Sequence, residues 1–203
     1  MSAPQTTRRS QADRRAETRE RVLDAATTLV AAHGSRAVSL AAVGAAAGYS
    51  RGIVNHHFGS KAQLLEELIK HTQTIDVSRE SPTGLTRLTD FAESYLRGMH
   101  ERSPRSEAFL KLWTESAGAE PSLKPLFAER DARFRETLIR HLHDGVADGS
   151  IRPDVDPQAT AVVIIGLLRG TALMAFSTAS DVSAADLATV GVRGVERSLA
   201  REA

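Results

Sequence analysis

Polar side chains suited to binding a polyanion lie close together between residues 39 and 61. Ser39 and Ser50 each precede a short apolar run, where a hydroxyl can cap a helix whose N-terminus attracts anions. Arg51 can donate two hydrogen bonds to guanine, Asn55 can donate one hydrogen bond to adenine and accept another from it, and Lys61 adds a positive charge. Taken singly, each is better explained as a solvated cap or surface side chain. Together they predict a surface that binds duplex DNA.

Two short helices must position these side chains. The spacing predicts one helix over residues 40–47, ended by Gly48, and a second over residues 51–57. Val43 of the first helix and Val54 of the second lie on facing sides. Two short helices joined by a three- or four-residue turn that contains Gly are typical of a helix-turn-helix.

The second helix leaves a polar outer face of the kind that reaches base edges in the major groove. The residues expected to contact DNA are Ser39, Tyr49, Ser50, Arg51, Gly52, Ile53, Asn55, His56, His57 and Lys61. Residues 1–61 hold nine Lys/Arg and four Asp/Glu, a net charge of +5, whereas residues 62–203 hold seventeen and twenty-one, a net charge of −4. A basic head on an acidic body favours nucleic-acid binding by the head, with ordinary surface charge as the alternative.

Apolar residues recur with helical spacing along almost the whole chain. Helices are expected over residues 12–33, 40–47, 51–57, 61–78, 85–99, 105–117, 122–148, 157–178 and 184–201. Asp156 ahead of Pro157 predicts an N-cap. No segment shows the alternation of a half-buried strand, so an all-α fold is predicted.

Several function classes are excluded or disfavoured by composition. The 203 residues include no Cys, which excludes a disulfide scaffold, a cysteine-based zinc site and a thiol nucleophile. The polar, Arg-rich N-terminus contains no secretory signal, so a cytoplasmic location is expected. GxSxG, GxxxxGK[ST], GxGxxG and HExxH are absent, which leaves an enzyme on a helical scaffold as a minor alternative.

Two pairs of histidines resemble metal ligands only in sequence. Neither His141 with His143 nor His56 with His57 places both imidazoles on one helical face. We therefore expect no metal and no cofactor, and we expect His141 and His143 to be solvated on a charged helix.

The stretch from Ala159 to Ala179 is apolar enough to resemble a membrane span. Arg169 lies at its centre, where a charge costs about 2.5–3.5 kcal/mol on insertion scales. A helix buried in a bundle or a subunit interface explains the segment better, so no membrane contact is expected. If buried, Arg169 needs a partner, and an acidic ligand or a carboxylate of a second subunit could supply it.

Residues 41–68, AAVGAAAGYSRGIVNHHFGSKAQLLEEL, resemble the N-terminal DNA-binding domain of TetR/AcrR-type bacterial transcriptional regulators. The elements that carry the resemblance are Gly48-x-Ser50, His57-Phe58 and Gly59-Ser60-Lys61 followed by Leu64-Leu65. The C-terminal part is similar in layout only. The resemblance implies a homodimeric repressor that binds a palindromic operator and leaves it when a small ligand binds. We expect a division into a disordered basic arm (1–11), a helix-turn-helix domain (12–60) and a ligand-binding and dimerisation domain (61–203).

Two residues depart from the family pattern. Asn55 stands where the family usually has a Tyr that reaches a phosphate, so a base contact by Asn55 becomes possible. Gly44 stands where Ala is common, at the predicted crossing of the two short helices, and could loosen the first of them.

The resemblance also implies a ligand cavity among the middle helices, and six of the nine aromatic residues lie between residues 91 and 134. Residues that could line the cavity are Phe91, Tyr95, Met99, Phe109, Leu112, Trp113, Phe127, Phe134, Leu138, Arg169, Thr171 and Met174. Glu115 is a further polar group that could orient a ligand. The alternative is a filled core in a DNA-binding regulator that has no small-molecule ligand.

Dimerisation, by the same resemblance, uses helices 157–178 and 184–201 paired with their symmetry mates. The sequence agrees, because the stretch from Ala159 to Ala179 is too apolar for the surface of a monomer.

Overall fold

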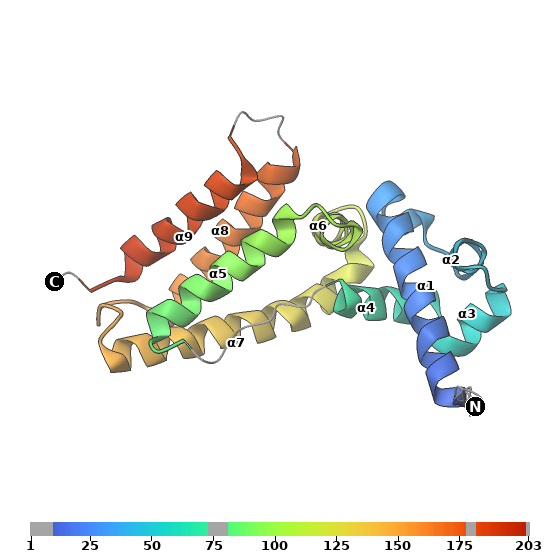
Figure 1. Ribbon diagram of the computed structural model, residues 1–203, viewed down its shortest axis with the longest axis horizontal. Coiled ribbons are helices and arrows are strands. Elements are labelled where there is room, and N and C mark those ends of the chain that lie inside the picture. The colour runs from blue at the N-terminus through green and yellow to red at the C-terminus, as the bar shows by residue number, and fades with distance from the viewer. Residues whose placement is uncertain (1–9, 73–80, 178–181, 202–203) are drawn as a thin grey trace, which may run out of the picture.

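A computed structural model describes residues 10–72, 81–177 and 182–201, and these ranges contain nine α-helices (Figure 1). The helices are α1 (Gln11–His33), α2 (Leu40–Ala47), α3 (Arg51–Phe58), α4 (Lys61–His71), α5 (Gly84–His100), α6 (Pro104–Ala117), α7 (Lys124–Asp148), α8 (Pro157–Ser177) and α9 (Ala184–Leu199). Two 3-10 turns, η1 (Ser35–Ala37) and η2 (Pro121–Leu123), precede α2 and α7. The described residues contain no strand beyond an isolated bridge between Ile151 and Ala200. The prediction of an all-α fold is confirmed.

Side-chain caps determine where most of these helices begin. Ahead of seven helices a hydroxyl accepts a hydrogen bond from the backbone N–H three residues later; these caps are Ser10, Ser39, Ser50, Ser60, Thr83, Ser103 and Ser183. Asp156 caps α8 as predicted, with its Oδ1 2.9 Å from the backbone nitrogen of Gln158. Each cap satisfies an N–H that has no partner inside the helix, so these starts depend on local residues alone.

The bounds differ from the expected ones at a few places. Helix α1 begins at Gln11, so residues 10 and 11 form its cap and first turn rather than the end of a disordered arm. Residues 1–9, and the part of the helix expected over 61–78 that follows Thr72, lie outside the described residues. The helix expected over 122–148 begins as η2, and α7 starts at Lys124 with a proline in its first turn, where no N–H is needed.

The helices form two groups with α6 between them (Figure 1). At one end α1 packs against α2 and α4, and α3 packs against α2 and α4. At the other end α5 contacts α7, α8 and α9, while α8 lies against both α7 and α9. Helix α6 contacts α1 and α4 on one side and α5 and α7 on the other. The two groups are therefore joined by packing as well as by the chain.

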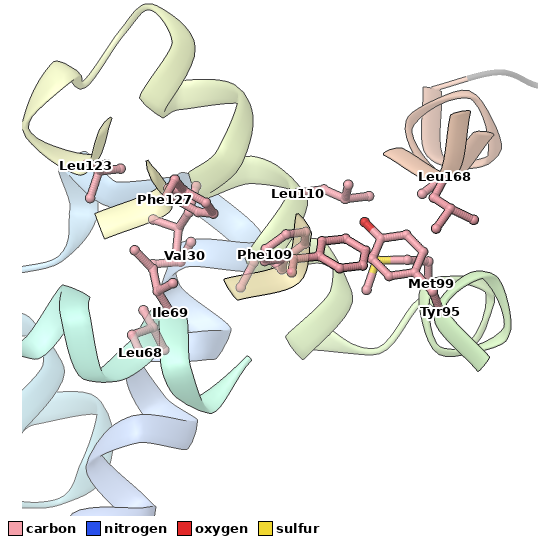
Figure 2. Packing of buried hydrophobic residues seen from close by; sticks show 14 of the residues in the cluster. Val30, Leu68, Ile69, Tyr95, Met99, Phe109, Leu110, Leu123, Phe127 and Leu168 are labelled. Carbon is pink, nitrogen blue, oxygen red and sulfur yellow. The ribbon is translucent and has the colours of Figure 1, made fainter. Parts of the chain in front are cut away.

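One continuous apolar core runs through both groups (Figure 2). Val30 of α1 and Ile69 of α4 lie beside Phe127 of α7, and Phe109 of α6 leads on to Tyr95 of α5. All five side chains are buried. Because the packing is continuous, a side-chain displacement at one end can be transmitted through neighbouring side chains to the other end.

Helix α8 is long and apolar enough to cross a membrane by length and composition. It packs against α5, α7 and α9, and Arg169 at its centre is buried in an ion pair with Asp131 of α7. Much of the remaining surface of α8 is exposed in the single chain. These contacts agree with a bundle helix that has one further face to cover.

Helix α6 holds the end of α1 and the start of η1 through two charged side chains one turn apart. The Lys111 Nζ donates hydrogen bonds to the carbonyl oxygens of Ala31 (2.7 Å) and Ala32 (3.2 Å), at the C-terminus of α1. The Glu115 Oε2 accepts a hydrogen bond from the backbone N–H of Ser35 at 3.0 Å. Both contacts satisfy backbone groups that the helix end leaves unpaired. The Glu115 carboxylate, which could orient a ligand, makes this backbone contact in the structure.

A second polar contact links the same helices on the surface. Glu20 and Asp24 of α1 lie beside His71 of α4. A carboxylate oxygen of each acidic residue and a ring nitrogen of the histidine lie within 4.8 Å of one another. The Arg105 guanidinium of α6 reaches both carboxylates, at 3.4 and 3.5 Å. The acidic groups are thus already paired with a cation. Exposed ion pairs of this kind stabilise by about 0–1 kcal/mol each.

His141 is buried, so the expectation that it is solvated on a charged helix is wrong, whereas His143 is exposed as expected. Neither ring nitrogen of His141 has a hydrogen-bond partner among the described residues. Burial, followed by the charges of Arg87 and Arg140, holds the pKa of His141 below its usual value. The imidazole is therefore neutral at pH 7 and serves as part of the core.

The N-terminus of α5 crosses α7 at two glycines. A Cβ added at Gly84 would lie 2.1 Å from the backbone nitrogen of Gly145 and 2.5 Å from the carbonyl oxygen of His141. Backbone cannot move aside as a flexible side chain does, so this crossing requires glycine. Gly98, on the same helix, has nothing within 4 Å of an added Cβ.

We expect Gly84→Ala to lower the free energy of unfolding by about 1–3 kcal/mol through overpacking. The matched control is Gly98→Ala, which should raise it by up to about 1 kcal/mol because alanine favours a helix interior. Urea unfolding followed by circular dichroism measures both. Equal effects of the two substitutions would contradict the close crossing.

Glu115→Ala should lower the free energy of unfolding by about 1–3 kcal/mol, because it leaves the buried N–H of Ser35 without an acceptor. Glu136→Ala, at an exposed position on α7, is the control and should change it by less than about 0.5 kcal/mol. The same urea titration at fixed protein concentration compares them. If both variants were as stable as the native chain, Glu115 would not hold η1.

Candidate nucleic-acid interface

Helices α2 and α3 form a helix-turn-helix whose geometry follows from local residues. The Ser39 Oγ accepts from the N–H of Ala42 at 3.0 Å, and the Ser50 Oγ accepts from the N–H of Ile53 at 3.3 Å. Gly48 ends α2 in the left-handed region, at φ 76°, which glycine adopts without strain. The turn of residues 48–50 then leads directly into α3.

Gly44 lies at the close approach between α2 and this turn. A Cβ on Gly44 would lie 2.8 Å from the Tyr49 carbonyl oxygen, and the Tyr49 N–H donates to the Gly44 carbonyl oxygen at 2.8 Å. The glycine therefore permits the contact predicted for it. Val43 of α2 and Val54 of α3 are buried beneath the crossing, as predicted.

The outer face of α3 is open to solvent. Arg51, Gly52, Ile53, Asn55 and His56 are exposed, while Val54 and Phe58 anchor the opposite side in the core. Of the remaining predicted DNA contacts, Ser39 and Ser50 are exposed, and Tyr49, His57 and Lys61 are half-buried. All ten residues therefore lie on the surface around one helix, with hydroxyls at both helix starts.

The N-terminal half of α1 adds positive charge beside α3. Burial, then the charge of Arg15, then His56 and Arg19, hold the pKa of His57 below its usual value. The Arg19 guanidinium lies over the Phe58 ring, 5.7 Å from its centroid, and pairs with Glu67 of α4. His57 is thus a neutral hydrogen-bond donor at pH 7. Sequence reasoning missed Arg19, although its spacing of four from Arg15 places both on one helical face.

The residues predicted to line a ligand cavity form a second cluster, in the body of the chain. Ten of the twelve are in or beside the core, and those that are buried are Phe91, Tyr95, Met99, Phe109, Leu112, Phe127, Phe134, Leu138 and Arg169. The Phe134 ring lies 5.0 Å from that of Phe91 and 6.0 Å from that of Tyr95, between centroids. Trp113 packs against the core, and Thr171 is half-buried. Met174 is 51% exposed.

Arg169 finds its partner inside the chain. Its Nη1 lies 2.8 Å from Oδ2 of Asp131 on α7, and its Nη2 contacts Oδ1 of the same carboxylate. The neighbouring Arg130 also reaches this oxygen, at 2.9 Å from its Nη1. The sequence correctly required a partner for Arg169 but did not identify Asp131 or Arg130, which look like ordinary charges in a polar stretch of helix.

Family models match both parts of the chain. The model described as bacterial regulatory proteins of the tetR family matches residues 22–68, which span the helix-turn-helix. The model of the C-terminal domain of BetI-type transcriptional repressors matches residues 84–200.

Curated proteins of similar sequence are named as transcriptional regulators or repressors. The chain is 30% identical over 152 residues to the HTH-type transcriptional repressor KstR2 of Mycolicibacterium smegmatis, covering 70% of this chain and 71% of that protein. It is 24% identical over 173 residues to the HTH-type transcriptional regulator UidR of Escherichia coli K12, covering 84% of each.

Solved structures share the fold. A transcriptional regulator from Saccharomonospora viridis in complex with choline superposes with a TM-score of 0.76 at 21% identity, covering 92% of this chain and 100% of that one. NalD of Pseudomonas aeruginosa gives a TM-score of 0.78 at 18% identity, covering 93% and 98%. The chain belongs to the TetR family of DNA-binding transcriptional regulators.

Proposed function

We propose that this regulator is a homodimeric repressor that binds a palindromic operator through α3 and leaves it when a small molecule binds the helical body. The observation that carries the proposal is the capped α2–turn–α3 unit, whose polar outer face is exposed at the basic end of the chain. Helix N-termini with free donors bind phosphates, and an exposed helix face reads base edges.

The side chains around α3 are proposed to make two kinds of contact with DNA. Arg51 and Asn55 on the outer face are proposed to contact guanine and adenine, respectively, in the major groove. Ser39, Ser50, His57 and Lys61 surround them and are proposed to contact phosphates, which fix the register of the protein on DNA.

Dimerisation is proposed through α8 and α9. Five large apolar side chains on these two adjacent helices are exposed in the single chain: Val162, Val163, Leu173, Met174 and Val190. A symmetric contact would cover them and place two α3 helices on one face of the duplex. Met174, which was also predicted to line a ligand cavity, would be covered by this interface.

The effector is proposed to bind near the aromatic cluster of the body. One of the similar structures is a complex with choline, a quaternary ammonium that aromatic faces can hold. In this chain the Trp113 ring already faces the guanidinium of Arg169, and the Phe109 ring faces that of Arg130. A cationic effector would meet these charges, so choline is not the proposed ligand. A regulator with a filled core and no effector is the competing outcome.

The operator contact is tested by alanine substitution against a duplex selected from random sequence by the purified protein. Arg51→Ala should weaken binding by about 1–3 kcal/mol and relax specificity at one base pair per half-site. Lys61→Ala should weaken binding to all sequences alike and reduce the salt slope by about 1. Arg135→Ala, at an exposed position on α7, is the control. Unchanged affinity in both test variants would refute the assignment of α3.

The dimer is tested by Val163→Glu, which places a carboxylate on a side chain that is 68% exposed in the single chain. We expect a shift from dimer to monomer in sedimentation velocity, because burying an unpaired charge is costly, and a loss of operator affinity of at least tenfold. Ala128→Glu, on the exposed side of α7, should leave both unchanged. A Val163→Glu protein that remained dimeric would rule out this face.

A further inference from the structure

Two buried guanidiniums share one carboxylate in the body of the chain. Nη1 of Arg130 and Nη2 of Arg169 both contact Oδ1 of Asp131, while Oδ2 accepts from Nη1 of Arg169 at 2.8 Å. The Arg130 and Arg169 side chains are 11% and 6% exposed. Burial, and then the charge of Arg169, lower the pKa of Arg130 to about 10, so the Arg130 guanidinium stays charged at pH 7. The group of three carries one positive charge in excess.

Two buried polar atoms beside this charge have no partner. The Tyr95 hydroxyl is buried and accepts or donates no hydrogen bond among the described residues, and the Arg169 Nε is likewise unpaired. Tyr95 is 1% exposed and close enough to Arg169, Arg130 and Asp131 to interact electrostatically with each of them. Its own pKa is raised by burial, so the hydroxyl keeps its proton. Tyr95 is near enough to Arg169 for a weak hydrogen bond between the two side chains, and neither the hydroxyl nor the Nε–H has a well-formed partner among the described residues.

The aromatic rings around the group are already occupied by cations. The Arg169 guanidinium lies 4.9 Å from the centroid of Trp113, and that of Arg130 lies 4.6 Å from Phe109 and 5.8 Å from Phe134. These faces stabilise the guanidiniums and hold them in place. A further cation would compete for the same faces and be repelled by the same charges.

A groove between α4 and α7 gives access to Arg130 from solvent. It has a volume of about 240 Å³, with Ile69 and Leu126 as its apolar walls. At its rim Lys70 is paired with Glu66 at 2.7 Å, and Arg133 with Glu129 at 2.8 Å. The rim charges are therefore neutralised by their own helices. Arg130 also lines the groove. Unlike Lys70 and Arg133, it shares its carboxylate partner, Asp131, with a second guanidinium, that of Arg169.

We propose that the effector is a small organic anion, a carboxylate on a short apolar body, which enters this groove and pairs with Arg130. The inference rests on the proposed function and names the chemical class of its ligand. The body lies between Ile69 and Leu126, and the carboxylate neutralises the excess charge of Arg130 and Arg169. The Arg130 guanidinium, which lines the groove, supplies the charged donors that a carboxylate requires.

The ligand class is tested with three probes of equal length: hexanoate, hexan-1-ol and hexyltrimethylammonium. Trp113 is the sole tryptophan of the chain and lies over Arg169, so its fluorescence reports on the group directly. We expect hexanoate to give saturable quenching and a calorimetric binding isotherm, with the other two probes at least tenfold weaker. Preference for the ammonium or the alcohol, or no saturation with hexanoate, would overturn the proposal.

Two substitutions at the group should act with opposite signs. Arg130→Gln removes the pairing cation and should weaken hexanoate binding at least tenfold, whereas Asp131→Asn removes the competing carboxylate and should strengthen it several-fold. Arg135→Gln, an exposed arginine on the same helix, should leave binding unchanged. Misfolding weakens binding in every variant, so a gain in Asp131→Asn cannot arise from it. Equal affinities in all three variants would place the anion elsewhere.

Operator titrations separate this inference from the proposed function. Hexanoate binding with unchanged operator affinity would support the anion site and refute induction through it. A chain that bound no selected duplex would refute the proposed operator contact, while the fluorescence result would still decide the ligand class. If hexanoate does release the operator, linkage requires the operator to weaken hexanoate binding by the same factor.

Discussion

The end of α1 imposes the constraint on which the arrangement of the whole chain depends. Its last carbonyls have no partner inside the helix, and the chain must turn at once through η1 into α2. Lys111 of α6 donates to these carbonyls, and Glu115 of α6 accepts from the backbone N–H of Ser35 on the other side of the turn. Since α6 also packs on α5 and α7, the orientation of the helix-turn-helix is determined partly by the body. A displacement of α6 would carry the start of α2, and with it α3.

The two polar centres of the molecule differ in how completely they are satisfied. At the end of α1 each charged side chain meets backbone groups of complementary polarity, which favours a single fixed position. Around Asp131 one carboxylate serves two buried guanidiniums, and a buried hydroxyl has no partner. Buried charges without full compensation cost stability, and such groups cluster at functional sites. The contrast agrees with a structural role for the first centre and with the binding role proposed for the second.

Sequence reasoning succeeded where the determining residues lie within a few positions of one another. The serine caps, the left-handed Gly48 and the burial of Val54 each depend on one turn of helix, so the helix-turn-helix was predictable in detail. The contact of Glu115 with Ser35 spans 80 positions, and that of Arg169 with Asp131 spans 38. Periodicity identifies which face of a helix is apolar but not which helix covers it.

The same limit explains why the burial of His141 and the exposure of Met174 were not predicted. His141 lies in a charged stretch and becomes buried because the glycine at the start of α5 lets that helix approach α7 closely. Met174 belongs to a helix that is apolar on most sides. Such a helix has no polar face, so its sequence does not show which apolar residues face the core of the chain and which face a second subunit.

The net charge of the body does not determine the electrostatic potential at one buried site within it. Residues 62–203 carry a net charge of −4, yet the charge buried around Asp131 is positive. Surface charges are screened over about 10 Å by salt, whereas a buried group responds mainly to its neighbours. An acidic surface slows the approach of anions in general, and small inorganic anions gain nothing from the apolar walls of the groove. In the proposed site, an anion whose body packs against Ile69 and Leu126 would gain both contacts, so the combination would select for an amphipathic acid over a simple ion.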